Sequence, residues 1–144
     1  MINESRIDIY DFLYNAFNDG VTNNVYLMDE PQELTKTDVS NGFIVITLGE
    51  FLDGSEFRGQ AYARIRCYIT AYVPTTTRGR LNVSKYKSME TAINSVIDVM
   101  MSNDNDAHYS VQDGSFLSMD DFDVTNANNP FHTFIRSFVL TIDG

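Results

Sequence analysis

The stretch AYARIRCYITAYV, residues Ala61–Val73, decides the fold because it alternates strictly between two kinds of side chain. The odd-numbered positions are apolar throughout: Ala61, Ala63, Ile65, Cys67, Ile69, Ala71 and Val73. The even-numbered positions carry larger polar or amphipathic groups: Tyr62, Arg64, Arg66, Tyr68, Thr70 and Tyr72. A period of two over this length is typical of an antiparallel strand that buries one face. We therefore expect a long strand from about Glu56 to Val73.

The residues before this strand predict its hairpin partner. FIVITLGEF, residues Phe43–Phe51, has the composition of a strand, and Asp53-Gly54 is a tight-turn dipeptide between the two runs. Further upstream, Val25–Met28 is predicted to be a short strand, and the polar segment Asp29–Gly42 a long exposed loop. A long β-hairpin is thus expected at the centre of the sheet.

Two amphipathic helices flank the hairpin. Apolar residues at helical spacing mark the first, which Asn3 or Ser5 can cap and Gly20 can end: Ile9, Phe12, Leu13, Ala16 and Phe17. The same spacing marks the second, with Ser88 as a plausible cap: Met89, Ala92, Ile93, Val96, Ile97 and Met100. The polar, locally basic segment Thr75–Lys87 is predicted to be a mobile connection. Small alanines on the strand favour close packing by a helix.

The last third of the chain is predicted to be β-structure. His108–Gln112 and Phe116–Val124 flank Asp113-Gly114, which indicates a second hairpin. Phe131–Ile142 is predicted to be a final strand, in which Arg136 interrupts an apolar face and suggests a bulge or an edge strand. We expect a single α+β domain over residues 1–144: an antiparallel β-sheet with a long hairpin packed against two amphipathic helices.

Composition narrows the classes of function. The 144 residues include 20 acidic and 10 basic ones, for a net charge of −10. Such a charge disfavours nucleic acid as a main partner, because duplex binding uses Lys and Arg to neutralise phosphates; it still permits a surface past which DNA slides. No apolar run approaches the roughly 18–20 residues of a membrane span, and the N-terminal residues do not resemble a signal peptide. The single cysteine, Cys67, excludes an intramolecular disulfide and lies on the apolar face, as a core residue would.

Catalytic and metal-binding signatures are missing from the sequence. It has no phosphate-binding loop, dinucleotide fingerprint or nucleophile elbow. His108 and His132 are its only histidines, and nothing in the sequence places either next to a nucleophile such as Cys67. The acids at Asp104, Asp106 and Asp120–Asp123 do not match a calcium loop, which favours a solvated acidic rim. We expect a protein that is not an enzyme and binds no cofactor or metal.

The order of the predicted elements resembles that of one family. It runs helix, short strand, long loop, long hairpin, basic connection, helix, hairpin and final strand. The matching segments are IYDFLYNAF, VYLMDEPQE leading into FIVITLGEF, ARIRCYITAYV leading through TTTRGR to SMETAINSVIDVM, and FHTFIRSFVLTI. In this order the chain resembles the tail-completion or tail-terminator proteins of tailed bacteriophages, which join head to tail in the neck. The loop Asp29–Gly42 and the turn Thr125–Pro130 depart from that pattern.

The resemblance implies a structural virion protein that is assembled in the host cytoplasm. Such proteins form closed rings, commonly hexamers for tail terminators and dodecamers for related neck proteins. The ring lies between the portal, or head connector, and the tail tube, ends tail polymerisation and leaves a channel through which DNA passes without specific binding. No membrane is involved. An acidic lumen, which the net charge of the chain could provide, suits the passage of DNA.

A head-to-tail ring needs two different complementary patches on each subunit. The long amphipathic side chains on the outer face of the strand are typical of a sheet face that meets another protein, although a solvated face explains them equally: Tyr62, Arg64, Arg66, Tyr68 and Tyr72. A second candidate pair is the basic Arg78–Lys87, with Arg80 and Lys85, against the acidic Asp113–Asp123, with Asp120, Asp121 and Asp123. Reversing Arg78 and Arg80 to Glu should then dissociate the ring at moderate salt, as native mass spectrometry would show.

Two other classes of function fit the composition. An acidic inhibitor of the immunity type, which would block a basic toxin or nuclease, suits the size and charge. It predicts a monomer whose acids crowd one face, whereas the ring predicts an oligomer with patches of both signs. A small-ligand pocket between sheet and helices is a third class, for which the sequence shows no convergent polar cluster.

Overall fold

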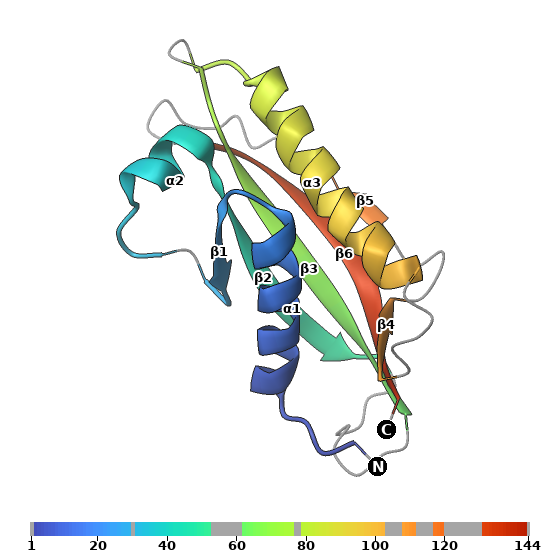
Figure 1. Cartoon of the computed structure of the whole chain (residues 1–144). Helices are drawn as coiled ribbons and strands as arrows, with labels where there is room; N and C mark the ends of the chain where they lie inside the picture. The colour runs from blue at the N-terminus through green and yellow to red at the C-terminus, as the bar shows by residue number, and fades with distance from the viewer. Residues whose placement is uncertain are drawn as a thin grey trace.

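The computed structural model describes residues 2–29, 31–52, 62–76, 79–102, 108–111 and 131–143, together with the backbone of 117–119. Within these residues the chain forms three helices and six strands in an α+β arrangement (Figure 1). In chain order they are α1 (Arg6–Gly20), β1 (Asn24–Leu27), α2 (Lys36–Asn41), β2 (Phe43–Phe51), β3 (Tyr62–Pro74), α3 (Val83–Ser102), β4 (Tyr109–Val111), β5 (Leu117–Met119) and β6 (Phe131–Asp143).

The sheet is mixed, mostly antiparallel and curled into a half-barrel. Its order is β1-β2-β3-β6-β4, with β5 also paired to β6, and only the β1–β2 pair is parallel. The predicted central hairpin is confirmed, because β2 and β3 pair antiparallel from Phe43↔Tyr72 to Phe51↔Ile65. The predicted turn at Asp53-Gly54, and the start of the strand near Glu56, lie outside the described residues.

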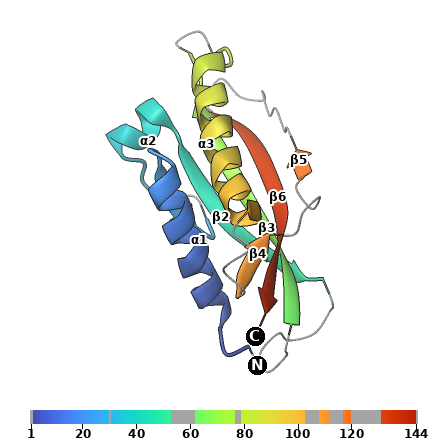
Figure 2. The ribbon, with the colours of Figure 1, turned by 45° about the vertical axis from the view of Figure 1, so that its right-hand side comes forward.

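The two long helices lie on one face of the sheet (Figures 1 and 2). The alternation of β3 is confirmed: from Ala63 to Val73 its odd-numbered residues are buried in the main core. That core also holds Leu13 and Phe17 of α1 and Ile93 and Ile97 of α3. A helix can pack closely on this face because Ala63, Cys67 and Ala71 are small.

Both long helices occur where apolar spacing predicts them, but their starting points are only partly as expected. Before α1, the backbone N–H and the hydroxyl of Ser5 both donate to Asp8 Oδ2, at 2.7 and 3.0 Å. The predicted start of the second helix at Ser88 is wrong, because α3 already begins at Val83. Asn82 Oδ1 accepts a hydrogen bond from the backbone N–H of Lys85, a contact that caps the first turn.

The prediction of a long exposed loop over Asp29–Gly42 is wrong in part. It contains α2, which begins with a capping box between Thr35 and Asp38 and ends at Gly42, where φ is +83°. The Asp38 side chain is fully buried and accepts hydrogen bonds from Asn24 Nδ2 at 2.8 Å and from the Tyr26 hydroxyl at 2.7 Å. Because both donors belong to β1, this buried carboxylate anchors α2 to the sheet.

The prediction of a second hairpin around Asp113-Gly114 is wrong. Both β4 and β5 pair antiparallel with β6, so they run in the same direction as each other along its outer edge. The final strand is confirmed as β6, but it is neither an edge strand nor bulged at Arg136. Its register with β3 is continuous from Tyr62↔Asp143 to Pro74↔Phe131. Arg136 is instead a buried residue of the helix-covered face, 2% exposed.

Candidate subunit interface

The even-numbered residues of β3 project from the sheet face opposite α1 and α3, as parity predicts. Tyr62 is 50% exposed, whereas Arg64, Arg66, Tyr68 and Tyr72 are half-buried. The structure therefore brings all five predicted residues of this strand to one face. They do not form a uniformly solvated stripe, because most of them pack on neighbouring strands.

An aromatic cluster that sequence reasoning missed occupies one end of this face. Phe43 and Tyr72 stack with ring centroids 4.5 Å apart, and Phe131 packs edge-on against Phe43 at 5.4 Å. Phe43 and Phe131 are 1% and 5% exposed, and Tyr26 packs edge-on against Phe43 at 5.6 Å. Tyr72 is thus held mainly by residues of its own chain. The sequence signal for this cluster was the alternation of side chains along each strand. Once the register of β2, β3 and β6 is known, this alternation places Phe43 and Phe131 on the same face as Tyr72 and on either side of it.

Tyr68 occupies space that a glycine provides. A Cβ at Gly49 would lie 2.9 Å from Tyr68 Cε2, so the ring covers β2 only because position 49 has no side chain. Across β6, Arg66 is opposite Val139 and Tyr68 is opposite Ser137, both of which are buried. This face therefore combines fixed aromatic rings with two arginines, a composition common at protein interfaces.

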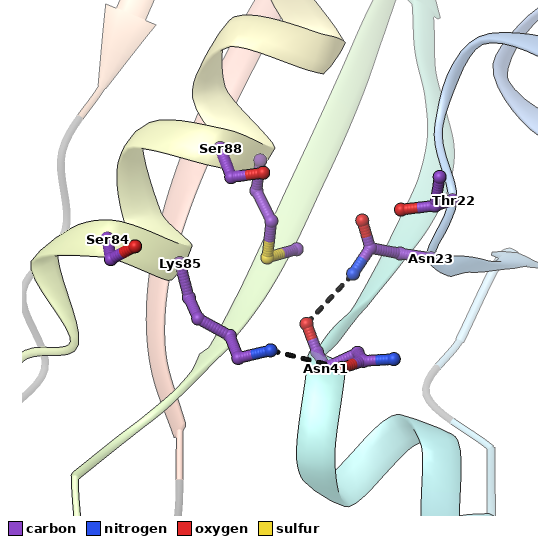
Figure 3. A pocket seen from close by; sticks show the side chains of 7 residues that line it. Thr22, Asn23, Asn41, Ser84, Lys85 and Ser88 are labelled. Atoms are coloured by element: carbon purple, nitrogen blue, oxygen red, sulfur yellow. Dashed lines mark hydrogen bonds between the residues drawn. The ribbon is translucent and has the colours of Figure 1, made fainter.

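The predicted basic patch is only partly within the described residues. Arg80 is exposed, whereas Lys85 is half-buried and its Nζ donates to Asn41 Oδ1 at 3.0 Å (Figure 3). Asn23 Nδ2 also donates to the backbone carbonyl oxygen of Asn41, at 2.8 Å. The hydrogen bond of Lys85 therefore joins α3 to the end of α2 within the same chain. These groups border a polar pocket lined by Thr22, Asn23, Asn41, Ser84, Lys85, Ser88 and Met89. Arg78 and the acids Asp120, Asp121 and Asp123 lie outside the described residues.

The cysteine and the two histidines lie in three different surroundings. Cys67 is fully buried, and this burial raises the pKa of its thiol far above the usual range. His108 Nε2 contacts the Glu4 carboxylate, and its Nδ1 lies 2.7 Å from the carbonyl oxygen of Asp143. His132 is 5% exposed, opposite Val73 on the helix-covered face.

The His108–Glu4 contact joins the N-terminal segment to the end of the last strand. Burial alone would raise the pKa of Glu4, but hydrogen bonds from backbone amides and from the His108 ring outweigh it and lower that pKa. Among the described residues, no group of three or more His, Cys, Asp or Glu side chains could hold a metal ion. None of the described helices is long and apolar enough to cross a membrane.

Comparison with protein-family models finds no match to this chain, and comparison with curated proteins finds none either. The fold class therefore rests on the structure: an α+β protein with two long helices on one face of a curled, mostly antiparallel sheet.

Proposed function

We propose that this chain is a structural virion protein of a tailed bacteriophage, a ring-forming head–tail joining or tail-terminator component. It connects the portal to the tail tube and lets DNA pass through the ring. The observation that carries the proposal is the clustering of exposed bases at the beginning of α3, at a distance from the exposed Asp98 and from Asp19 at the end of α1. A subunit with separate patches of opposite sign can bind the next copy head to tail.

The separation of charge is clearest on α3 and the turn before it. Arg80, Lys85 and Lys87 lie at the beginning of the helix, and no basic residue follows Lys87 as far as Ser102. Glu90, the acid nearest these bases on α3, is paired with Arg136 of β6. Asp98 lies in the last third of α3, and Asp19 lies near the end of the neighbouring α1. This arrangement favours a ring over an acidic inhibitor, because the inhibitor would present acids alone on its binding face.

The sheet face opposite the two long helices is the second support. Arg64 and Arg66 lie beside aromatic rings that neighbouring strands hold in place. These rings lose little side-chain entropy when a partner covers the face. A face of this kind can accept another copy or a neighbouring neck protein. The overall negative charge suits the channel, since an acidic lumen does not retain DNA.

The test is the mass and shape of the purified protein at low salt, alone and with the portal and tail-tube proteins of the same virus. The expected particle has six or twelve times the 16.3 kDa mass of one chain and a central channel in negative-stain images. A chain that stays monomeric under all these conditions contradicts the proposal. A one-to-one complex with a basic toxin or nuclease would instead support the inhibitor.

The contribution of the sheet face is tested separately. The variant Arg64→Glu with Arg66→Glu is expected to weaken assembly on this face, whereas Lys36→Glu, a reversal at the exposed start of α2, should leave assembly unchanged. If the double variant assembles as the natural sequence does, this face is not an assembly surface.

A further inference from the structure

The two most exposed large apolar side chains of the described residues both belong to α3. Val99 is 64% exposed and Val83 is 53% exposed. At about 1.5 Å per residue, the helix places them roughly 24 Å apart along its axis. Each therefore belongs to a different surface of the molecule.

Val99 borders an apolar groove between α1 and α3, which lie side by side in both views (Figures 1 and 2). The groove is about 300 Å³ and is lined by Ala16, Asp19, Gly20, Ser95, Val96, Val99 and Met100. Gly20 allows α1 and α3 to approach closely beside the groove, because a Cβ there would lie 2.2 Å from Val96 Cγ2. The groove is large enough to receive a branched aliphatic side chain.

One edge of this groove is acidic. Asp19 lines it from α1 and is the charged residue among those that line the groove. Within α1 and the part of α3 after Lys87, all of it described, Arg6 is the only basic residue. Its guanidinium group donates to the carbonyl oxygens of Leu48 and Gly49, at the other end of α1. A partner for this groove would therefore carry an apolar side chain flanked by positive charge.

Val83 has these surroundings. Lys87 follows it by four residues, so the two side chains lie on the same face of the helix. Arg80 precedes the helix by three residues, and both basic residues are exposed. The beginning of α3 thus presents an apolar side chain between two basic ones, the complement of the acidic apolar groove.

We propose that the beginning of α3 in one copy, with Val83 at its centre, docks into the α1–α3 groove of the next copy. Arg80 and Lys87 then approach Asp19 at the edge of the groove. Because the two surfaces are too far apart to meet within one chain, the contact forms between copies. It joins different surfaces and is therefore head to tail, which yields a closed ring when the rotation closes. This inference rests on the proposed function and names the contact that would build its ring.

The test is site-directed crosslinking of the full chain with a short bismaleimide. Because Cys67 is buried and poorly ionised, engineered surface cysteines provide the reactive thiols. The double variant Val83→Cys with Val99→Cys should give a ladder of crosslinked multimers. Val83→Cys alone and Val99→Cys alone should give none, since the contact places position 83 against position 99. The control Val39→Cys with Val99→Cys uses a valine that is 51% exposed on α2 and should not give a ladder.

Charge reversal gives an independent readout. Arg80→Glu with Lys87→Glu, or Asp19→Lys alone, should each raise the dissociation constant of the oligomer at least about tenfold. Combining all three changes restores opposite charges across the contact and should recover assembly. If oligomers form without the 83–99 crosslink and are indifferent to these reversals, the ring uses another surface and the inference is overturned. If no oligomer forms alone or with the portal and tail-tube proteins, the proposed function fails as well.

Discussion

Arg136 of β6 donates from Nη2 to a carboxylate oxygen of Glu90 on α3, and this ion pair joins the sheet to the helix layer. The Arg136 side chain is 3% exposed and that of Glu90 is 35% exposed. The guanidinium group also lies over the Phe134 ring, 4.7 Å from its centroid. A buried arginine is thus accommodated in an apolar strand because a helix residue supplies the opposite charge.

Replacing Glu90 by Gln should lower the free energy of unfolding by about 1–3 kcal/mol, because it leaves a buried cation without its counter-charge. This is less than the roughly 3–5 kcal/mol for a fully buried ion pair, because Glu90 is partly solvated. Arg136→Met should cost less, because Glu90 can then turn to water. Urea denaturation measures both, with Glu33→Gln at an exposed position as the control. A larger loss for Arg136→Met than for Glu90→Gln would contradict this account.

Gly20→Ala should destabilise the protein by about 1 kcal/mol, although alanine is the better helix former. The new Cβ would overlap Val96 Cγ2, and the β-branched valine has little freedom to move away. In a Val96→Ala background the same change should be neutral or stabilising. A double-mutant cycle on the midpoint of urea unfolding measures this reversal, and the same sign in both backgrounds would refute the close helix contact.

Asp38→Asn should cost about 1–3 kcal/mol at neutral pH, because the carboxylate accepts charge-assisted hydrogen bonds in the core. Burial alone would raise the pKa of Asp38, but hydrogen bonds from Tyr26, Thr35 and Asn24 outweigh it and lower that pKa below its ordinary value. A carboxyl group whose pKa is lower in the folded than in the unfolded state stabilises the fold at pH values above its unfolded pKa. This stabilisation is lost as the pH falls through the folded pKa. The natural chain should therefore lose its advantage over Asp38→Asn below about pH 4. Asp11→Asn, at an exposed position on α1, is the matched control.

Tyr10→Phe should cost about 1–3 kcal/mol through one lost hydrogen bond. The Tyr10 hydroxyl accepts from the backbone N–H of Leu48 at 3.1 Å, where the β2–β3 register shifts. Removing the hydroxyl leaves this N–H buried without its partner. Tyr14→Phe on the same helix, at a residue that is 36% exposed, should have little effect. Equal effects of the two changes on thermal unfolding would contradict this role for Tyr10.

Cys67 should react with an aromatic disulfide reagent only as fast as the chain unfolds. Its thiol is fully buried, and burial raises its pKa, so the native state holds almost no accessible thiolate. The reaction rate should match the unfolding rate and rise with urea. Rapid labelling of the native protein would show that the strand opens locally.

Much of the fold could be predicted from periodicity. The alternation from Ala61 to Val73 gave the buried face of β3, and helical spacing gave the buried faces of α1 and α3. These predictions succeed because a repeated apolar position within one element reports directly which side of that element is buried. The stripe from Tyr62 to Tyr72 followed from the same parity.

Contacts between elements were harder to predict. The turn dipeptide Asp113-Gly114 suggested a local hairpin between neighbouring strands. Instead, β4 and β5 each pair with β6, which lies further along the chain. The helix α2 escaped prediction because its anchor is one buried aspartate held by β1, with no apolar periodicity to reveal it. Arg136 was misjudged because its partner is on another element.

The sequence by itself determined the class of fold, the central hairpin and the side of each long element that faces the core. Only the tertiary structure decided which strands neighbour β6, how the rings of Phe43, Tyr72 and Phe131 pack, and where the groove between α1 and α3 lies. The physical reason is the range of the interactions. Burial of one face is repeated along a single element and is visible in one dimension, whereas a groove or an ion pair depends on two segments that meet only when the chain folds.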